Sequence, residues 1–236
     1  MLNQILYTLG RPVVNFYAAA MFEMDVVWEE TLSAGPKIIA PNHPSTTDPF
    51  LITGLIAEPT SILIDDRLFK VPVFGRYLHL TGHVPVVNGN GREAFETAMR
   101  LLEAGRSIAI FPEGAVSPLE GGLHRPRTGV ARLALSTGVP IIPIGIHLQR
   151  DRIHVIESTY SGISATGTWY LRGPYAMTVG KPMTFVGDVE DREYVQMVSE
   201  RVIRRIAHLA QQSAHRLNRP TRRGTQPLRQ VPGEMV

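Results

Sequence analysis

The sequence predicts an α/β fold, in which a single domain holds a largely parallel or mixed sheet flanked by helices. Short apolar runs bounded by turn residues alternate with helical patterns along most of the chain. The 236 residues are 44% hydrophobic and their mean hydropathy is close to zero, which is typical of a globular chain. This length suffices for one large domain with a substantial core.

The predicted strands are short apolar segments, and several are rich in β-branched residues. Five segments fit well and two fit more weakly: 37–40, 60–64, 83–87, 107–111 and 140–148, then 152–156 and 176–179. Helices are predicted between them at 49–57, 92–103, 128–137 and 188–217. Repeated strand-helix units favour a parallel sheet, in which functional sites gather at the carboxyl ends of the strands.

The N-terminal segment 1–24 is the most apolar part of the chain, but polar residues, Gly10 and Pro12 interrupt it. It therefore matches neither a spanning helix of about 18 apolar residues nor a signal peptide. Apolar residues at helical spacing and aromatic anchors instead predict an amphipathic helix in a membrane interface. These residues are Leu2, Ile5, Leu6, Leu9, Tyr7, Phe16 and Tyr17. A core helix packed on the sheet is an open alternative.

Charge and cysteine content exclude several classes of protein. The chain has no cysteine, which rules out disulfides and thiolate metal sites and fits a reducing compartment. The formal net charge is +3, and no nucleic-acid-binding module is present, so no nucleic-acid partner is expected. Basic residues concentrate in the tail 218–236, which is expected to be disordered. Its arginines either attract anionic lipid or are solvated without a partner.

His43 and Asp48, five residues apart in Asn42-His43-Pro44-Ser45-Thr46-Thr47-Asp48-Pro49, are the candidate catalytic pair. A neutral imidazole can accept a proton from a hydroxyl near pH 7, and a carboxylate on its other nitrogen orients it. Side chains five apart do not share a helix face, so the pair needs a bend, which Pro44 supplies. The alternative hypothesis is that Asp48 only caps a helix that begins with Pro49.

Two further segments lie downstream in a fixed order, Phe111-Pro112-Glu113-Gly114 and Val139-Pro140-Ile141-Ile142-Pro143. Together with Asn42–Asp48 they resemble, in order and spacing, the conserved blocks of the glycerolipid acyltransferase family, to which lysophosphatidic acid acyltransferases belong. The resemblance covers about residues 24–187. It implies an acyltransferase domain over 25–217.

The chain departs from the family pattern at the positions that hold the acceptor's phosphate. Asn88 stands where the second block has arginine, and Ala115 and Val116 replace the Thr-Arg of the third. Arginine suits phosphate because its planar fork bonds two oxygens at once. Either the acceptor's head group is not a simple phosphate, or a nearby arginine substitutes: Arg92, Arg125 or Arg127.

The resemblance implies transfer of an acyl group from acyl-CoA or acyl carrier protein to a lipid hydroxyl, without a bound cofactor or metal. His43 would be the general base and Asp48 its orienting acid, while Asn42, Glu113 and Gly114 would bind the acceptor. From the residues alone, the alternative is that Glu113 is a buried structural carboxylate bonded to loop amides. The expected location is peripheral, on the cytoplasmic face of a membrane. An inactive lipid-binding protein with the same fold is the alternative function.

A second motif resembles a dinucleotide-binding fingerprint. Gly89-Asn90-Gly91-Arg92-Glu93-Ala94 fits G-x-G-x-x-A between a predicted strand and helix, and Glu113 follows about twenty residues later. A simple turn between strand and helix explains the same glycines. Dinucleotide binding therefore stays open as a third, weaker hypothesis.

Overall fold

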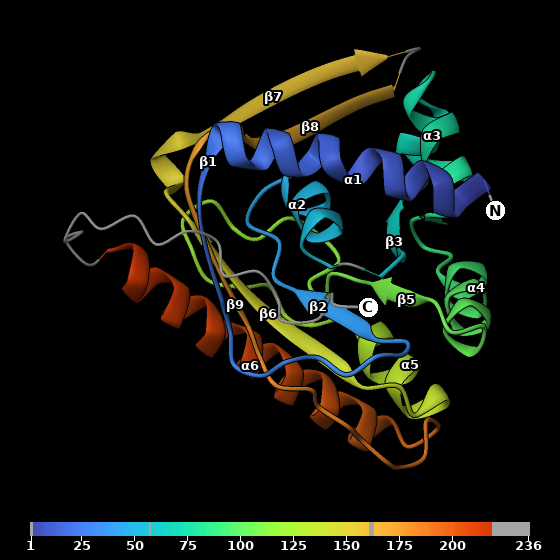
Figure 1. Ribbon diagram of the computed structural model, residues 1–236. Helices are drawn as coiled ribbons and strands as arrows, with labels where there is room; N and C mark the ends of the chain where they lie inside the picture. Colours follow the sequence, from blue (N-terminus) through green and yellow to red (C-terminus); the bar gives the residue numbers. More distant parts are fainter. Residues whose placement is uncertain (1, 57, 161–162, 219–236) are drawn as a thin grey trace, which may run out of the picture.

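The computed structural model describes residues 2–56, 58–160 and 163–218. Seven strands of this part of the chain form one mixed sheet, in the order β1-β9-β6-β2-β5-β3-β4. From β6 to β4 each strand runs parallel to its neighbour, whereas β9 is antiparallel to β6 and parallel to β1. The α/β fold and its largely parallel sheet are thereby confirmed (Figure 1).

The strands of the sheet are β1 (Phe22–Trp28), β2 (Ile38–Pro41), β3 (Thr60–Asp65), β4 (Val84–Val86), β5 (Ser107–Ala109), β6 (Ile141–Leu148) and β9 (Gly173–Val179). A separate antiparallel hairpin consists of β7 (Ile153–Tyr160) and β8 (Ile163–Tyr170). The α-helices are α1 (Leu2–Met21), α2 (Asp48–Leu55), α3 (Phe74–Thr81), α4 (Arg92–Glu103), α5 (Gly129–Thr137) and α6 (Arg192–Leu217). Two short 3-10 helices are η1 (Asp66–Lys70) and η2 (Arg150–Arg152).

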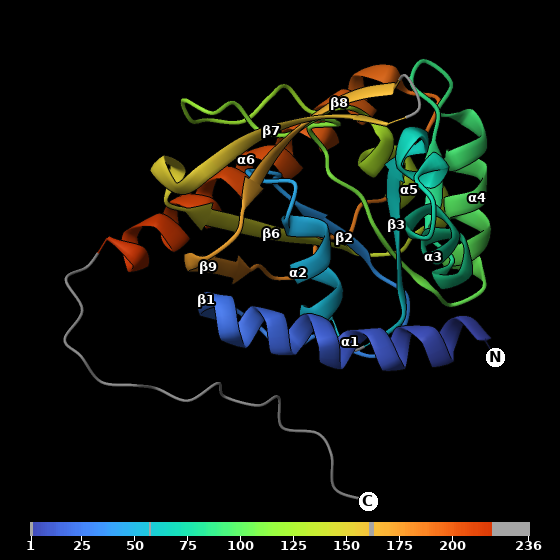
Figure 2. The ribbon, with the colours of Figure 1, turned by 90° about the horizontal axis from the view of Figure 1, so that it is seen from above.

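Helices cover both faces of the sheet and create two apolar cores. On one face α4, α5 and α6 pack against the strands around residues such as Ile38, Leu133 and Val202. On the other face α2 lies between the sheet and α1, which Figure 2 shows from above. The core on that face includes Phe22 and the tyrosines Tyr170 and Tyr175. Both faces are buried because parallel strands with apolar residues on each side need cover from water.

All seven predicted strands and all four predicted helices are present, with ends shifted by a few residues. Five elements were not foreseen: strand β1, helix α3, the hairpin partner β8 and the two 3-10 helices η1 and η2. Strand β1 begins at Phe22, inside the segment 1–24 that the sequence analysis assigned entirely to a membrane-associating segment. Phe22 is buried between α1 and the sheet, so the sheet begins earlier than expected.

Helix α1 packs along α2 and α3, and Pro12 lies inside it. Within the described residues, none of the helices is both long enough and apolar enough to cross a bilayer. The side chains of residues 2–9, which carry Leu2, Ile5, Leu6, Tyr7 and Leu9, lie outside the described part. So does the expected disordered tail from residue 219 onward.

Candidate active site

The loop between β2 and α2 brings His43 and Asp48 together. His43 Nδ1 lies 3.0 Å from Asp48 Oδ2, and the Asp48 side chain is completely buried. Thr47, not Asp48, occupies the cap position of α2, and Asp48 is the first residue of the helix. The hypothesis that Asp48 is only a helix cap is therefore wrong: its carboxylate turns back along the loop to His43.

Three donors hold the Asp48 carboxylate. Oδ2 accepts from the Ser45 amide at 2.8 Å as well as facing His43, and Oδ1 accepts from the Tyr175 hydroxyl at 2.6 Å. Because a carboxylate oxygen only accepts, the His43 proton sits on Nδ1 and Nε2 keeps a free electron pair. The His43 ring stacks on Phe111, with ring centroids 4.1 Å apart. This arrangement fixes the tautomer and the ring orientation that a general base needs.

Glu113 connects the loop after β5 to the His43 loop after β2, as expected from neighbouring parallel strands. The carboxyl group is 3% exposed and accepts three hydrogen bonds. Oε1 accepts from the His43 amide at 3.0 Å and from the Ser117 hydroxyl at 2.6 Å, and Oε2 accepts from the His124 amide at 2.8 Å. Glu113 thus fixes the backbone of His43, which is the structural role left open by the sequence.

A cavity of about 1160 Å³ opens beside the pair, with His43, Thr46 and Phe111 in its wall. Most of its other lining residues are apolar, and the volume exceeds the roughly 300–1,000 Å³ of ordinary small-molecule pockets. His83 also lines it, but burial, helped by nearby Arg106, lowers the pKa of His83 to about 4. Its Nδ1 accepts from the Ile62 amide at 3.1 Å, so it is a neutral part of the wall.

Three arginines line the cavity, and they differ in their partners. Arg67 pairs with Asp65 at 2.7 Å, and Arg11 donates to the Gly54 carbonyl. The Arg127 guanidinium makes no hydrogen bond or ion pair with any other described residue. It packs against Gly114, where φ is +65° and an added Cβ would lie 2.3 Å from Arg127 Nε. A residue without a side chain at 114 therefore leaves the space that the Arg127 side chain occupies in the cavity wall.

The other predicted substrate-binding residues divide into two groups. Asn88 lines the cavity together with Ala115 and Val116. Asn42 instead bonds both backbone groups of Ile146 on β6, at 3.0 and 2.7 Å, which ties the loop to the neighbouring strand. Arg92 is exposed and pairs with Glu96, and Arg125 is exposed and lies outside the cavity lining.

The motif that resembles a dinucleotide fingerprint forms an ordinary turn. The Asn90 amide donates to the Val87 carbonyl at 3.0 Å, and Gly89 has φ of +82° before α4 begins. The acid of the proposed fingerprint, Glu113, is occupied by its three protein donors. Neither the glycine turn nor Glu113 therefore supports dinucleotide binding.

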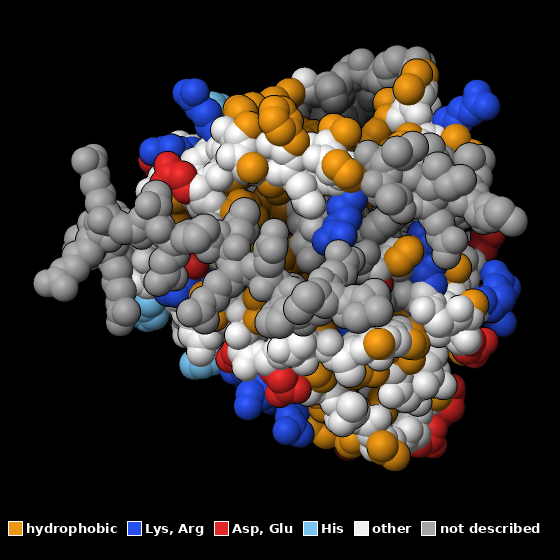
Figure 3. All heavy atoms as spheres, viewed as in Figure 1, with side chains coloured by type: hydrophobic (Ala, Val, Ile, Leu, Met, Phe, Trp, Pro, Cys, Tyr) orange, Lys and Arg blue, Asp and Glu red, His pale blue; other side chains and the backbone are white. Residues whose placement is uncertain are grey.

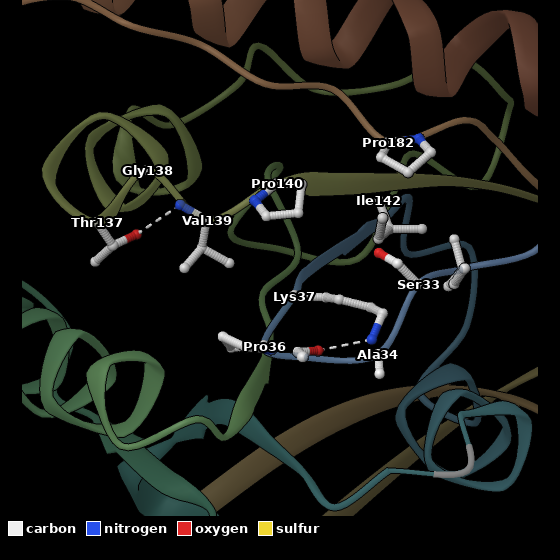
Figure 4. A pocket seen from close by; sticks show the side chains of 12 residues that line it. Ser33, Ala34, Pro36, Lys37, Thr137, Gly138, Val139, Pro140, Ile142 and Pro182 are labelled. Atoms are coloured by element: carbon white, nitrogen blue, oxygen red, sulfur yellow. Dashed lines mark hydrogen bonds between the residues drawn. The ribbon is translucent and has the colours of Figure 1, made fainter.

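A smaller cavity of about 280 Å³ lies at the opposite end of β2 (Figure 4). Its buried cation, Lys37, pairs with Glu58 at 2.6 Å and donates to the Gly35 carbonyl at 2.7 Å. That charge is already neutralised. In the part of the chain that the structure describes, no group of three or more His, Asp or Glu could hold a metal ion.

Sequence reasoning missed the residues that hold the site from the distant hairpin and from β9. Ser45 Oγ donates to the Thr168 carbonyl at 3.0 Å, and Thr47 Oγ1 donates to the Tyr170 carbonyl at 2.9 Å. The Thr168 amide in turn donates to Thr46 Oγ1 at 3.0 Å. Nothing in the pattern of the hairpin signals these contacts, because they join segments more than 120 residues apart.

These features define an α/β domain with a buried His–Asp pair in the wall of a large apolar cavity. The model of the acyltransferase family matches residues 23–147, more than half of the chain. The chain belongs to the acyltransferase family.

Relatives and a solved structure agree with this placement. The 1-acyl-sn-glycerol-3-phosphate acyltransferase of Saccharomyces cerevisiae is 25% identical over 188 residues, which are 77% of this chain and 59% of the relative. The enzyme of that name from Escherichia coli is 29% identical over 127 residues, covering 52% of this chain and 51% of the relative. The chain thus spans only about half, or slightly more, of these relatives' lengths.

The crystal structure of the 1-acyl-sn-glycerophosphate (LPA) acyltransferase PlsC from Thermotoga maritima has a similar fold, with a TM-score of 0.57. It is 23% identical in sequence, and the match covers 87% of this chain and 79% of that one. At this identity the likeness concerns the fold.

Proposed function

We propose that this protein transfers a fatty acyl group from a thioester, acyl-CoA or acyl carrier protein, to the hydroxyl of a lysophospholipid or related glycerolipid. The observation that carries the proposal is the His43–Asp48 pair, 3.0 Å apart, in the wall of the apolar cavity. A fatty acyl chain needs such an apolar space, and the attacking hydroxyl needs a base at its edge.

The proposed reaction is direct acyl transfer. His43 Nε2 takes the proton of the acceptor hydroxyl as its oxygen attacks the thioester carbonyl carbon. The new ester C–O bond forms, the C–S bond breaks, and the proton passes from His43 to the leaving thiolate. Asp48 orients the imidazole and stabilises the imidazolium that forms between these steps. The proposal includes no bound cofactor or metal.

Release of free thiol tests the proposal. The purified protein is incubated with long-chain acyl-CoA or acylated carrier protein and a panel of acceptors, namely lysophosphatidic acid, other lysophospholipids and uncharged lipids. Because the chain lacks cysteine, it adds no background to a thiol reagent. Acceptor-dependent release supports an acyltransferase. The absence of release with every donor and acceptor would favour the inactive lipid-binding protein.

We also propose that Arg127 binds an acidic head group of the acceptor, because it lines the cavity and its guanidinium has no ion pair within the described residues. Arg127→Ala is expected to raise KM for lysophosphatidic acid about tenfold, since a hydrogen bond to a charged group contributes about 1.5–3 kcal/mol. KM for an uncharged monoacylglycerol should change little. Arg92→Ala, which removes an exposed arginine paired with Glu96, is the matched control. Equal changes for both acceptors would argue against this role.

Peripheral association with the cytoplasmic face of a membrane is a further part of the proposal. Val13 and Phe16 of α1 are 67% and 76% exposed, and Figure 3 shows hydrophobic side chains near the described, C-terminal part of α1. Tyr17, in contrast, packs edge-on against Phe22 and donates to the Leu171 carbonyl, so it faces the protein. An apolar helix face beside the cavity would let a lipid acceptor enter from the bilayer.

Phe16→Glu is expected to reduce binding to phosphatidylglycerol-containing vesicles about tenfold in a co-sedimentation assay. The reason is that burial of one phenylalanine side chain contributes about 1.5–3 kcal/mol. Val186→Glu is the control. Val186 is 92% exposed in the loop before α6, and α6 packs on the face of the sheet opposite to α1. If both variants sediment like the unaltered protein, α1 is not the membrane-binding element.

A further inference from the structure

We propose that Tyr175 of β9 is a positioning residue of the catalytic pair, which it serves by holding the second oxygen of Asp48. The inference rests on the proposed acyl transfer. The Tyr175 hydroxyl lies 2.6 Å from Asp48 Oδ1, and both side chains are completely buried. Tyr175 lies 127 residues after Asp48 in the chain, beyond the region that the family model matches.

The geometry makes the tyrosine a donor to the carboxylate. Burial first, and then the negative charge and hydrogen bond of Asp48, raise the pKa of Tyr175 well above its usual value. Neighbouring Tyr170 adds to the same shift. The phenol therefore keeps its proton, and Asp48 Oδ1 is the acceptor at 2.6 Å.

The two oxygens of Asp48 have separate tasks. Oδ2 faces His43 and also accepts from the Ser45 amide, whereas Oδ1 accepts, among the described residues, from the tyrosine alone. The ring of Tyr175 itself lies in an aromatic cluster: Phe22 meets it edge-on with centroids 5.7 Å apart, and the centroid of Tyr170 lies 6.2 Å from it. A buried carboxylate oxygen without a donor is costly. Without the phenol, the Asp48 carboxylate would rotate toward another donor, and that change weakens its hold on His43.

Tyr170 provides a matched control for removal of one buried hydroxyl. As a residue it is as little exposed as Tyr175 and it packs in the same aromatic cluster, with its hydroxyl partly buried. Its hydroxyl donates to the Pro174 carbonyl at 2.8 Å and not to Asp48. Tyr175→Phe and Tyr170→Phe therefore lose the same atom from the same core, but only the first loses a contact of the catalytic pair.

The experiment compares both variants with the unaltered protein by two readouts. The first is the kinetics of thiol release: Tyr175→Phe is expected to lower kcat about tenfold with KM for the acceptor unchanged, and Tyr170→Phe to stay within about twofold. The second is the proton NMR signal of His43 Nδ1–H, identified by its loss in His43→Ala. That signal should shift in Tyr175→Phe and stay in place in Tyr170→Phe.

The two readouts separate the failure of this inference from the failure of the proposed function. If the unaltered protein transfers acyl groups and the two variants behave alike, Tyr175 is only a core residue and the inference is overturned. If no acyl transfer is found, the function proposal fails, but the NMR comparison still decides whether Tyr175 holds the pair. An unchanged His43 signal in Tyr175→Phe overturns the inference in either case.

Discussion

Replacement of His43 by alanine is expected to lower kcat for acyl transfer about a hundred- to ten-thousand-fold, the range that a positioned general base contributes. The methyl group of alanine can neither accept the hydroxyl proton nor return it to the leaving thiolate. The His43 side chain is only 15% exposed, so bulk water has little access to this position and does not take over the role of the base. Release of thiol from acyl-CoA in the presence of the preferred acceptor measures the loss.

Two controls make the result specific. His154 is an exposed histidine on β7, so His154→Ala should leave kcat unchanged. Circular dichroism of His43→Ala should match that of the unaltered protein, because the Asp48 and Glu113 contacts to the loop backbone remain; the melting temperature should fall modestly, because buried Asp48 loses one donor. Acyl transfer that survives in the variant within a few-fold would eliminate the general-base mechanism.

Of the variants proposed for this protein, Glu113→Ala is expected to lower the free energy of unfolding most. The change leaves three donors, the amides of His43 and His124 and the hydroxyl of Ser117, without their acceptor, and Glu113 itself is buried. Each stranded donor costs about 1–3 kcal/mol, so a total of about 3 kcal/mol or more is expected. For a domain of this size that corresponds to a fall in Tm of about 6–12 °C, measured by thermal unfolding.

The matched control is Glu120→Ala, which removes an exposed carboxylate from the same loop region and should shift Tm by little. Activity should fall in Glu113→Ala as well, because the amide of His43 is one of the released donors. A variant with the melting temperature of the unaltered protein would show that Glu113 is not the carboxylate that joins the two loops.

The sequence was sufficient to predict that His43 and Glu113 meet. Each follows a short apolar strand, and the carboxyl ends of neighbouring parallel strands lie at the same edge of a sheet. The predicted His43–Asp48 contact needed only a bend within a loop of a few residues. In both cases the contact follows from a local sequence pattern, because strands and proline-containing turns can be predicted from neighbouring residues.

The contacts of Tyr175, Thr168 and Tyr170 could not be predicted in this way. They depend on β9 running antiparallel to β6, and on the hairpin β7–β8 folding back to the His43 loop. The contact of Asn42 depends on the fold in a similar way: its amide bonds the backbone of Ile146 on β6, 104 residues further along the chain. The place of Arg127 likewise depends on the backbone of Gly114, whose positive φ is a feature of the folded loop.

The pairing of β1 with β9 has a consequence for synthesis of the protein. Phe22 pairs with Gly173, so a ribosome releases the first strand long before its partner exists. Until then β1 is an unpaired strand with an apolar residue at its start, which is a hazard for aggregation. Contacts between such distant residues also make folding slow. A nascent chain of this protein would therefore benefit from a chaperone until β9 has emerged and the edge of the sheet is complete.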